Sequence, residues 1–312
     1  MGKNLKIAFF TEGNYHGKLQ RSASGRTDVN WIVSLDATHH NIYEPLSEKF
    51  DIGIIIIPKK FNGDWQKLYD LKRNCEILSV MQEADQIAFQ RMTVPNQIEY
   101  INFLSEVDLI LAHNEIDKKY FAGLIPNKKV EILPTLMLED NIRPDVFVKE
   151  GRYGVMSGGT WSDWYCGADS FMIAQEFEEP IFAPSMGRKQ PEEDLIQDIR
   201  YLPYSDWKTW MFNLSKCKYA VHLMRTAAAG SFSINCAVLK IPSIGWDQID
   251  AQRICYPELS FPVGDMVEAR KAAKHLKNNE LFYDHVAEYA FKAYKDNFHE
   301  DRFLERFCGY FQ

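Results

Sequence analysis

Ionisable side chains stand directly after apolar runs in the first half of the chain. Glu83 follows the run EILSVM, and His113 follows VDLILA. A carboxylate or imidazole held at such a point can take a proton from a hydroxyl group as a general base. The third candidate is Asp28, two residues after Arg26 at the start of a predicted helix. We rank it first of the three because of this position. Each has an alternative role: a helix-start carboxylate for Asp28, a salt bridge for Glu83 and a buried structural histidine for His113.

Basic and aromatic residues lie near the same strand ends. The predicted strands 6–11 and 51–58 are followed by polar loops, and a predicted helix spans 26–37. The residues that we expect to line a binding site at this edge are Tyr15, His16, Lys18, Arg26 and Lys59. His39 and His40 follow the helix and precede the next predicted strand, 41–43, so we expect them at the opposite edge in a structural or solvated role.

Glycine, hydroxyl and cationic residues follow the apolar runs of the second half. The turn Gly158–Thr160 can bring backbone N–H groups close to a phosphate, although a plain turn explains it equally well. A predicted helix begins near Ser231, shortly after Arg225, and its free N–H groups suit a diphosphate. The residues that we expect to bind such an anion are Gly158, Gly159, Thr160, Arg188, Lys189, Arg225, Ser231, Phe232 and Ser233.

Apolar runs alternate with helical patterns along the whole chain. Further strands are predicted at 76–81, 107–112, 130–133, 152–156, 180–183, 219–223 and 242–245. Helices are predicted at 65–73, 96–104, 116–124, 169–176, 206–215, 231–239, 266–277, 281–298 and 300–310. Continuous apolar strands separated by helices are typical of a parallel sheet covered on both faces. The pattern therefore predicts a doubly wound α/β fold, in which ligands bind beyond the carboxyl ends of the strands.

The stretch 134–151 interrupts this pattern with two prolines, several acids and no apolar period. We place a domain boundary there, with a first domain over 1–140, a second over 151–297 and a terminal helix over 298–312. The chain has 312 residues, a hydrophobic fraction of 46% and a formal net charge of −7. That charge argues against a dedicated non-specific nucleic-acid binder, but a local basic face can coexist with an acidic remainder.

The six cysteines form no Cys-x-x-Cys pair, so the spacing of a zinc site is absent from the sequence. The apolar run 7–10 is too short for a secretory signal, and 52–57 has the length of a strand. We therefore expect a cytoplasmic protein with reduced cysteines and no membrane partner.

The two-domain α/β pattern, together with the segment from Ser231 to Ser243, resembles the GT-B class of glycosyltransferases. The resemblance implies two facing Rossmann-like domains with an interdomain cleft and a terminal helix that returns toward the first domain. It implies a nucleotide-sugar, expected to be a UDP-sugar, on the second domain and an acceptor on the first. The residues then expected on the acceptor side are Tyr15, His16, Lys18, Arg26 and Lys59. Many retaining members carry two Glu residues where this chain has Ala227 and Asn235, and Asn235 can still hydrogen-bond a ribose hydroxyl.

The sequence has no Asp-x-Asp pair, the metal-diphosphate device of the other large glycosyltransferase class. We therefore expect no obligatory metal or other cofactor, with Arg188, Lys189 and Arg225 meeting the charge of the leaving diphosphate.

The segments DIGIIIIPKK, VMQEAD and AHNEID are also similar to glycosyltransferases of tailed phages. This likeness suggests a hydroxymethylated base in phage DNA as the acceptor, and the host cytoplasm as the location if a phage encodes the protein. Two alternatives stay open, a nucleotide-sugar epimerase on the same scaffold and a non-catalytic carbohydrate- or nucleic-acid-binding protein.

Overall fold

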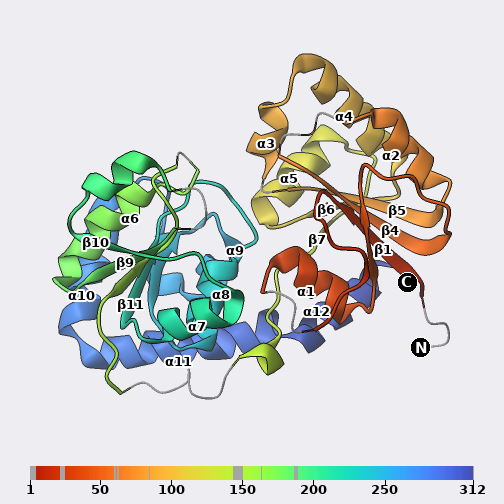
Figure 1. Ribbon diagram of the computed structural model, residues 1–312. Helices are drawn as coiled ribbons and strands as arrows, with labels where there is room; N and C mark the ends of the chain where they lie inside the picture. Colours follow the sequence, from red (N-terminus) through yellow and green to blue (C-terminus); the bar gives the residue numbers. More distant parts are fainter. Residues whose placement is uncertain are drawn as a thin grey trace. The chain divides into compact units, whose positions relative to one another are not determined.

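The computed structural model describes residues 5–21, 25–59, 61, 63–83, 85–142, 150–162, 164–185 and 189–311. The chain divides into two compact units (Figure 1). The first unit comprises Met1–Pro134 together with Phe303–Gln312, and the second unit comprises Thr135–Arg302. Each unit is a layered α/β structure with its own sheet and its own hydrophobic core.

The first unit has a seven-stranded sheet in the order β2-β3-β1-β4-β5-β6-β7. Every neighbouring pair is parallel except β2 and β3. The chain runs from β1 outward to β3 and then returns to the other side of β1 as β4. The pair β1 and β4 is therefore a switch point, where ligands bind in open α/β sheets. The strands are β1 Ile7–Thr11, β2 Gly17–Lys18, β3 Thr38–Asn41, β4 Phe50–Ile57, β5 Cys75–Gln82, β6 Leu109–Ala112 and β7 Val130–Ile132.

Polar caps start several helices of the first unit directly after strand ends. Asp85 and Asn114 accept hydrogen bonds from the first turns of α3 and α5, as expected for residues that satisfy free N–H groups. The last helix, α12, buries Phe303 and Phe307. The helices are α1 Thr27–Ser34, α2 Trp65–Lys72, α3 Gln86–Gln90, α4 Val94–Glu106, α5 Glu115–Leu124 and α12 Glu300–Tyr310.

The second unit has a six-stranded, fully parallel sheet in the order β10-β9-β8-β11-β12-β13. Its switch point is the pair β8 and β11, because the chain runs outward through β9 and β10 before it returns as β11. The strands are β8 Val155–Ser157, β9 Ile181–Pro184, β10 Ile199–Leu202, β11 Tyr219–His222, β12 Ser243–Trp246 and β13 Ser260–Phe261.

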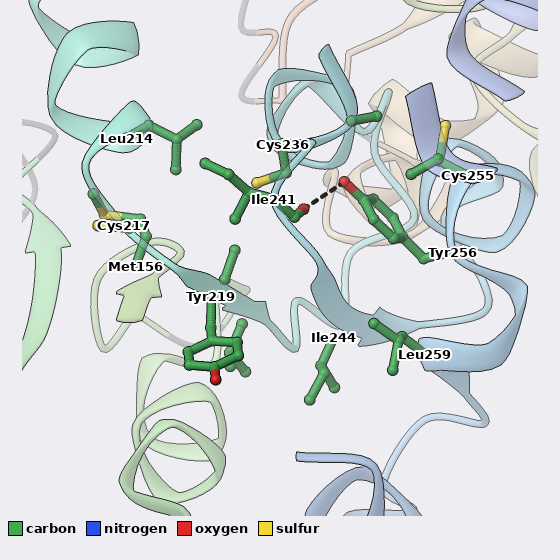
Figure 2. Close-up of a cluster of buried hydrophobic side chains, with 14 of the residues drawn as sticks. Met156, Leu214, Cys217, Tyr219, Cys236, Ile241, Ile244, Cys255, Tyr256 and Leu259 are labelled. Carbon is green, nitrogen blue, oxygen red and sulfur yellow. Dashed lines mark hydrogen bonds between the residues drawn. The ribbon is translucent and has the colours of Figure 1, made fainter. Parts of the chain in front are cut away.

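A large apolar core holds this second sheet and its helices together. Figure 2 shows part of it, where the buried hydroxyl of Tyr256 donates a hydrogen bond of 2.7 Å to the carbonyl of Ile241. The bond satisfies a polar group that burial would otherwise leave unpaired. The helices are α6 Gly167–Ala174, α7 Trp207–Ser215, α8 Ser231–Val238, α9 Asp250–Cys255, α10 Met266–Asn278 and α11 Glu280–Asn297, with 3₁₀ turns at Glu139–Asn141, Gln175–Phe177, Pro191–Leu195 and Pro257–Leu259.

The predicted α/β fold class is confirmed, with two largely parallel sheets and helices between their strands. Some elements differ from the sequence prediction. The strand expected at 41–43 is β3, Thr38–Asn41, and the elements β2, β10, β13, α3 and α9 were not predicted. Within the described residues, every helix is too short or too polar to cross a membrane.

Candidate functional site

Side chains of β3 form hydrogen bonds with Thr11, at the end of β1, and with the loop that follows it. His39 contacts the Thr11 hydroxyl through Nε2 at 2.7 Å and the Tyr15 carbonyl through Nδ1. Asn41, the next residue on the same face of β3, donates to the carbonyl of Gly13 at 3.3 Å. The expectation that His39 and His40 precede the strand and lie at the opposite edge is therefore wrong. Both belong to β3, and His39 supports the loop at the carboxyl end of β1.

Three of the predicted residues, Tyr15 of this loop, Arg26 and Asp28, lie in contact. The guanidinium of Arg26 donates to both carboxylate oxygens of Asp28, at 3.1 and 2.9 Å. It also lies over the ring of Tyr15, 5.9 Å from the centroid. Asp28 occupies the first turn of α1, where the helix dipole favours a negative charge, and its side chain is 14% exposed. The carboxylate is thus oriented by Arg26 and still reachable from solvent.

The strand end of β5 places Glu83 beside the strand end of β4. The Lys59 backbone N–H donates to Glu83 Oε2 at 3.2 Å, and the Lys59 ammonium lies 3.8 Å from Oε1. The Glu83 N–H in turn donates to the carbonyl of Ile57 at 2.8 Å. Glu83 therefore makes the salt bridge that was its alternative role, and this pair joins the ends of β4 and β5, next to the β1–β4 switch point.

His113 follows β6 and packs against α1. Its ring stacks on Trp31 at 5.7 Å between centroids with an interplanar angle of 19°, and the Trp31 indole donates to the carbonyl of Pro134 at 2.7 Å. Burial, aided by the charge of Lys59, lowers the pKa of His113 to about 4. The imidazole is therefore neutral at pH 7. Its Nδ1 is buried without a hydrogen-bond partner among the described residues.

His16 and Lys18 lie further along the same loop, on the side of the edge strand β2. Both side chains are about two-thirds exposed, and Lys18 pairs with Asp36. His16 lies 4.0 Å from Glu44. The structure thus brings Tyr15, Arg26 and Asp28 into one cluster and Lys59 and Glu83 into another, while His16 and Lys18 form exposed pairs with other acids.

In the second unit, the predicted glycine turn follows β8 at the switch point. A Cβ atom on Gly158 would lie 2.5 Å from the ring of His222, the last residue of β11. Gly159 has φ +82°, a conformation that favours glycine, and a Cβ there would meet Tyr165 at 2.8 Å. The turn therefore requires glycine at both positions, and its backbone packs directly on aromatic rings.

His222 was not among the predicted site residues. Its ring stacks on Tyr165 at 6.1 Å and meets Phe232 edge-on at 4.7 Å. Burial lowers the pKa of His222 to about 4. Its Nε2 is buried with no hydrogen-bond partner in the described part of the chain. Its place at a strand end was the only sequence signal, because a histidine inside an apolar run reads as core.

The start of α8 carries the remaining predicted residues. Gly230 precedes the helix with φ +85°, and the side chain of Ser233 is buried against Gln252 at 2.8 Å. In the orientation that satisfies both of its amide atoms, Asn235 accepts from the Trp210 indole and donates to the carbonyl of Ser231, each at 3.1 Å. Ser233 and Asn235 thus already hold hydrogen bonds within the unit, and Ser231 and Phe232 stand half-buried at the helix start.

Three cations, Arg188, Lys189 and Arg225, were predicted to neutralise a diphosphate near this helix. Arg225 is 60% exposed and lies 3.4 Å from Asp169 in the first turn of α6, so its guanidinium is available at the surface. Lys189 pairs with Asp194 and covers the ring of Tyr201 at 4.5 Å. Thr160, next to the glycine turn, contacts the hydroxyl of Ser162 at 3.2 Å. Arg188 lies outside the described residues. Among the residues described, no three His, Cys, Asp or Glu side chains are grouped to hold a metal ion.

Comparison with known proteins gives a likeness of structure alone. Neither a protein-family model nor a curated protein matches the sequence. The structure of Alr3699/HepE from Anabaena, in complex with UDP and glucose, has a TM-score of 0.66 at 10% identity and covers 98% of this chain and 99% of its own. An alpha-glucosyltransferase in complex with UDP and a 13-mer DNA containing a HMU base has a TM-score of 0.62 at 12% identity, covering 97% and 98%.

A structure of TarM from S. aureus, in complex with ligands that include UDP, has a TM-score of 0.62 at 10% identity and covers 82% of this chain. This chain spans only 55% of the TarM structure, but nearly all of the other two. These likenesses establish that the chain has the GT-B fold, as the sequence resemblance implied.

Proposed function

We propose that the protein is a glycosyltransferase that moves a sugar from a UDP-sugar to an acceptor hydroxyl. The observation that carries this proposal is the GT-B fold over the whole chain, shared with enzymes whose structures contain UDP. The polar clusters at the β1–β4 and β8–β11 switch points support it, since these are the places where α/β sheets bind ligands. In this proposal residues 1–140 bind the acceptor and residues 151–297 bind the donor.

The proposed chemistry needs two kinds of help. The acceptor oxygen forms a bond to the anomeric carbon while the bond from that carbon to the diphosphate breaks, and UDP leaves with the bonding electrons. The start of α8, Arg225 and Lys189 would stabilise the charge on the departing diphosphate without a metal ion. Asp28, Glu83 and His113 are the candidates to receive the acceptor proton, and the accessible, oriented carboxylate of Asp28 is the first choice.

We further propose that the acceptor is a hydroxymethylated base in DNA. Tyr15 and Arg26 form a cation–π pair beside Asp28, and Lys59 stands at the neighbouring strand end. Such residues suit phosphate and base contacts, and a base in a duplex must leave the stack before it can enter an enzyme site. The structural neighbour that contains UDP and DNA with a HMU base supports the same substrate class. In this proposal the protein acts in the cytoplasm, which is the host cytoplasm if a phage encodes it.

The test is a transfer assay with the full chain, radiolabelled UDP-glucose or UDP-N-acetylglucosamine, and two matched duplexes. One duplex carries hydroxymethylated pyrimidines and the other the unmodified bases. The proposal expects label on the modified duplex only. A new sugar nucleotide formed without acceptor would favour an epimerase instead. Binding of UDP or DNA without any transfer would favour a non-catalytic protein, and transfer only to small molecules would leave the transferase but refute the DNA acceptor.

A further inference from the structure

His39 is a buried histidine that the candidate chemistry does not use. It lies on β3, paired with Phe9 of β1 on one side and with Gly17 of β2 on the other, and its side chain faces the loop that joins β1 to β2. His40, the next residue, packs instead between the rings of Phe10 and Phe50. Adjacent histidines on one strand thus serve opposite faces of the sheet.

The hydrogen bonds around His39 fix its tautomer. The Tyr15 carbonyl can only accept, so Nδ1 of His39 carries the proton and donates to it. Nε2 of the neutral ring then accepts from the Thr11 hydroxyl, and the Thr11 oxygen accepts from the Gly13 N–H at 3.1 Å. One imidazole therefore closes a chain of hydrogen bonds that spans the whole turn from Thr11 to Tyr15.

Electrostatics keep this arrangement in place at neutral pH. Burial lowers the pKa of His39, the hydrogen bond to Tyr15 and the charge of Asp28 act in the raising direction, and His40 and His16 add to the lowering. The net direction is downward, so the ring is neutral at pH 7 and Nε2 remains an acceptor for Thr11.

The clamped turn presents the predicted acceptor residues. The Tyr15 ring meets the His39 ring edge-on at 5.5 Å between centroids, and the Arg26 guanidinium lies over the Tyr15 ring at 5.9 Å from its centroid. Arg26 in turn orients Asp28 through two hydrogen bonds. Contacts therefore run without a break from His39 through Tyr15 and Arg26 to the candidate base.

We propose that His39 is a positioning residue that holds Tyr15, and through it Arg26 and Asp28, in the geometry needed for the acceptor. This inference rests on the proposed transferase function. His39 touches no substrate in it. Its effect is to fix the turn, so that the acceptor meets an ordered surface and does not have to order the loop on binding.

The experiment compares His39→Phe with His39→Asn and with Thr11→Val. Phenylalanine keeps a flat ring but removes both hydrogen bonds, whereas the asparagine amide can still donate to the Tyr15 carbonyl. Thr11→Val removes the middle of the chain with little change of shape. His40→Phe is the matched control, because it replaces the neighbouring histidine on the other face of the same strand.

We expect the KM for hydroxymethylated DNA to rise about tenfold in His39→Phe, which loses both hydrogen bonds of the imidazole, with the KM for the UDP-sugar unchanged. His39→Asn should recover part of this loss. Hydrogen exchange at the Gly13 amide should quicken in His39→Phe and Thr11→Val but not in His40→Phe. An unchanged acceptor KM in His39→Phe, or an equal rise in the KM of both substrates without recovery by asparagine, would overturn the proposal.

The exchange measurement separates this inference from the proposed function. If the natural chain transfers sugar to no acceptor, the transferase proposal fails in the activity assay. The clamp is still tested by the Gly13 amide, because its hydrogen bond to Thr11 exists without substrate. If the Gly13 amide exchanges no faster in His39→Phe than in the natural chain, the clamp itself is refuted even where transfer is observed.

Discussion

The guanidinium of Arg26 donates two hydrogen bonds, of 3.1 and 2.9 Å, to the carboxylate of Asp28. The two residues are separated by one position at the entry to α1, so the ion pair forms within a single turn of chain. Paired Arg–carboxylate contacts orient both groups. The pair therefore gives the first candidate base a fixed direction while 14% of its side chain stays exposed.

Asp28→Asn should lower kcat at least about 100-fold, because asparagine keeps the shape but cannot accept a proton in the transition state. The KM for the UDP-sugar should not change. Initial rates with hydroxymethylated DNA measure both constants. Asp36→Asn is the control, since Asp36 is an exposed carboxylate of the same unit that pairs with Lys18. If Asp28→Asn keeps full activity and Glu83→Gln loses it, the base is Glu83.

Arg225→Ala should weaken UDP binding by about 1–3 kcal/mol, the range of a charged hydrogen bond. Its exposed guanidinium and its distance of 3.4 Å from Asp169 make it the accessible cation beside the predicted diphosphate position. Titration calorimetry with UDP and with UMP gives the measurement, and the loss should be larger for UDP. Arg73→Ala is the control, because Arg73 is an exposed arginine of the other unit paired with Asp70. Equal affinities in wild type and Arg225→Ala would remove Arg225 from the donor site.

Gly158→Ala should abolish the stabilisation of the protein by UDP, since the added Cβ would lie 2.5 Å from the His222 ring and force the turn after β8 to move. A ligand that binds only the folded state raises the melting temperature, so a thermal shift with and without UDP reports the loss. Gly123→Ala is the matched control. Nothing lies within 4 Å of a Cβ there, and alanine in the α5 helix should slightly stabilise the protein. A full UDP shift in Gly158→Ala would show that the turn does not carry the nucleotide.

Acid should destabilise the protein between about pH 6.5 and pH 4. Burial lowers the pKa of both His113 and His222 to about 4, and it lowers the pKa of His39 and His40 as well. In this window the unfolded chain binds protons that the folded chain does not, so the free energy of unfolding falls as pH falls. Each of His113 and His222 can contribute up to roughly 2 kcal/mol between pH 6.5 and pH 5.

Melting temperatures at pH 7.5 and pH 5 test this expectation. The drop between the two should be smaller in His222→Gln than in wild type, because glutamine does not take up a proton. His285→Gln is the control, since His285 is exposed beside Glu258. The same drop in wild type and His222→Gln would contradict a depressed pKa at His222.

The sequence predicted best what long apolar runs dictate. The isoleucines of β4 form a strand that is buried almost throughout, as a continuous apolar run in a parallel sheet covered on both faces predicts. The strand β3, with the polar sequence THHN, shows no apolar pattern, and its place depends on pairing with β1 and on contacts with the following loop. The edge strands β10 (IRYL) and β13 (SF) are mostly half-buried or exposed, so neither shows a continuous apolar run.

The candidate site shows the same division. The rule that parallel strands present their carboxyl ends together singled out Glu83 and His113, which do follow β5 and β6, and the start of the first helix singled out Asp28, which lies in the first turn of α1. The sequence could not predict that Arg26 donates hydrogen bonds to Asp28 or that the Lys59 N–H donates one to Glu83, because these pairs depend on loop geometry and rotamers. His39 was expected at the opposite edge, because its contacts with a carbonyl and a hydroxyl 24 and 28 positions away cannot be seen in the sequence.

Salt should weaken the proposed DNA complex steeply, because phosphate contacts release counterions, with a slope of about −0.9 per contact in log K against log salt. Lys18→Glu should weaken binding across all sequences and make that slope shallower by about one contact or more. The exposed ammonium of Lys18 on the edge strand β2 is near the turn that carries Tyr15, so it can reach a phosphate while the base approaches Arg26 and Asp28.

Fluorescence anisotropy with a hydroxymethylated duplex at several salt concentrations measures the slope. Lys271→Glu, an exposed lysine of α10 in the second unit, should leave it unchanged. UDP affinity should be the same in both variants, and a slope that Lys18→Glu does not alter would place the DNA elsewhere on the protein.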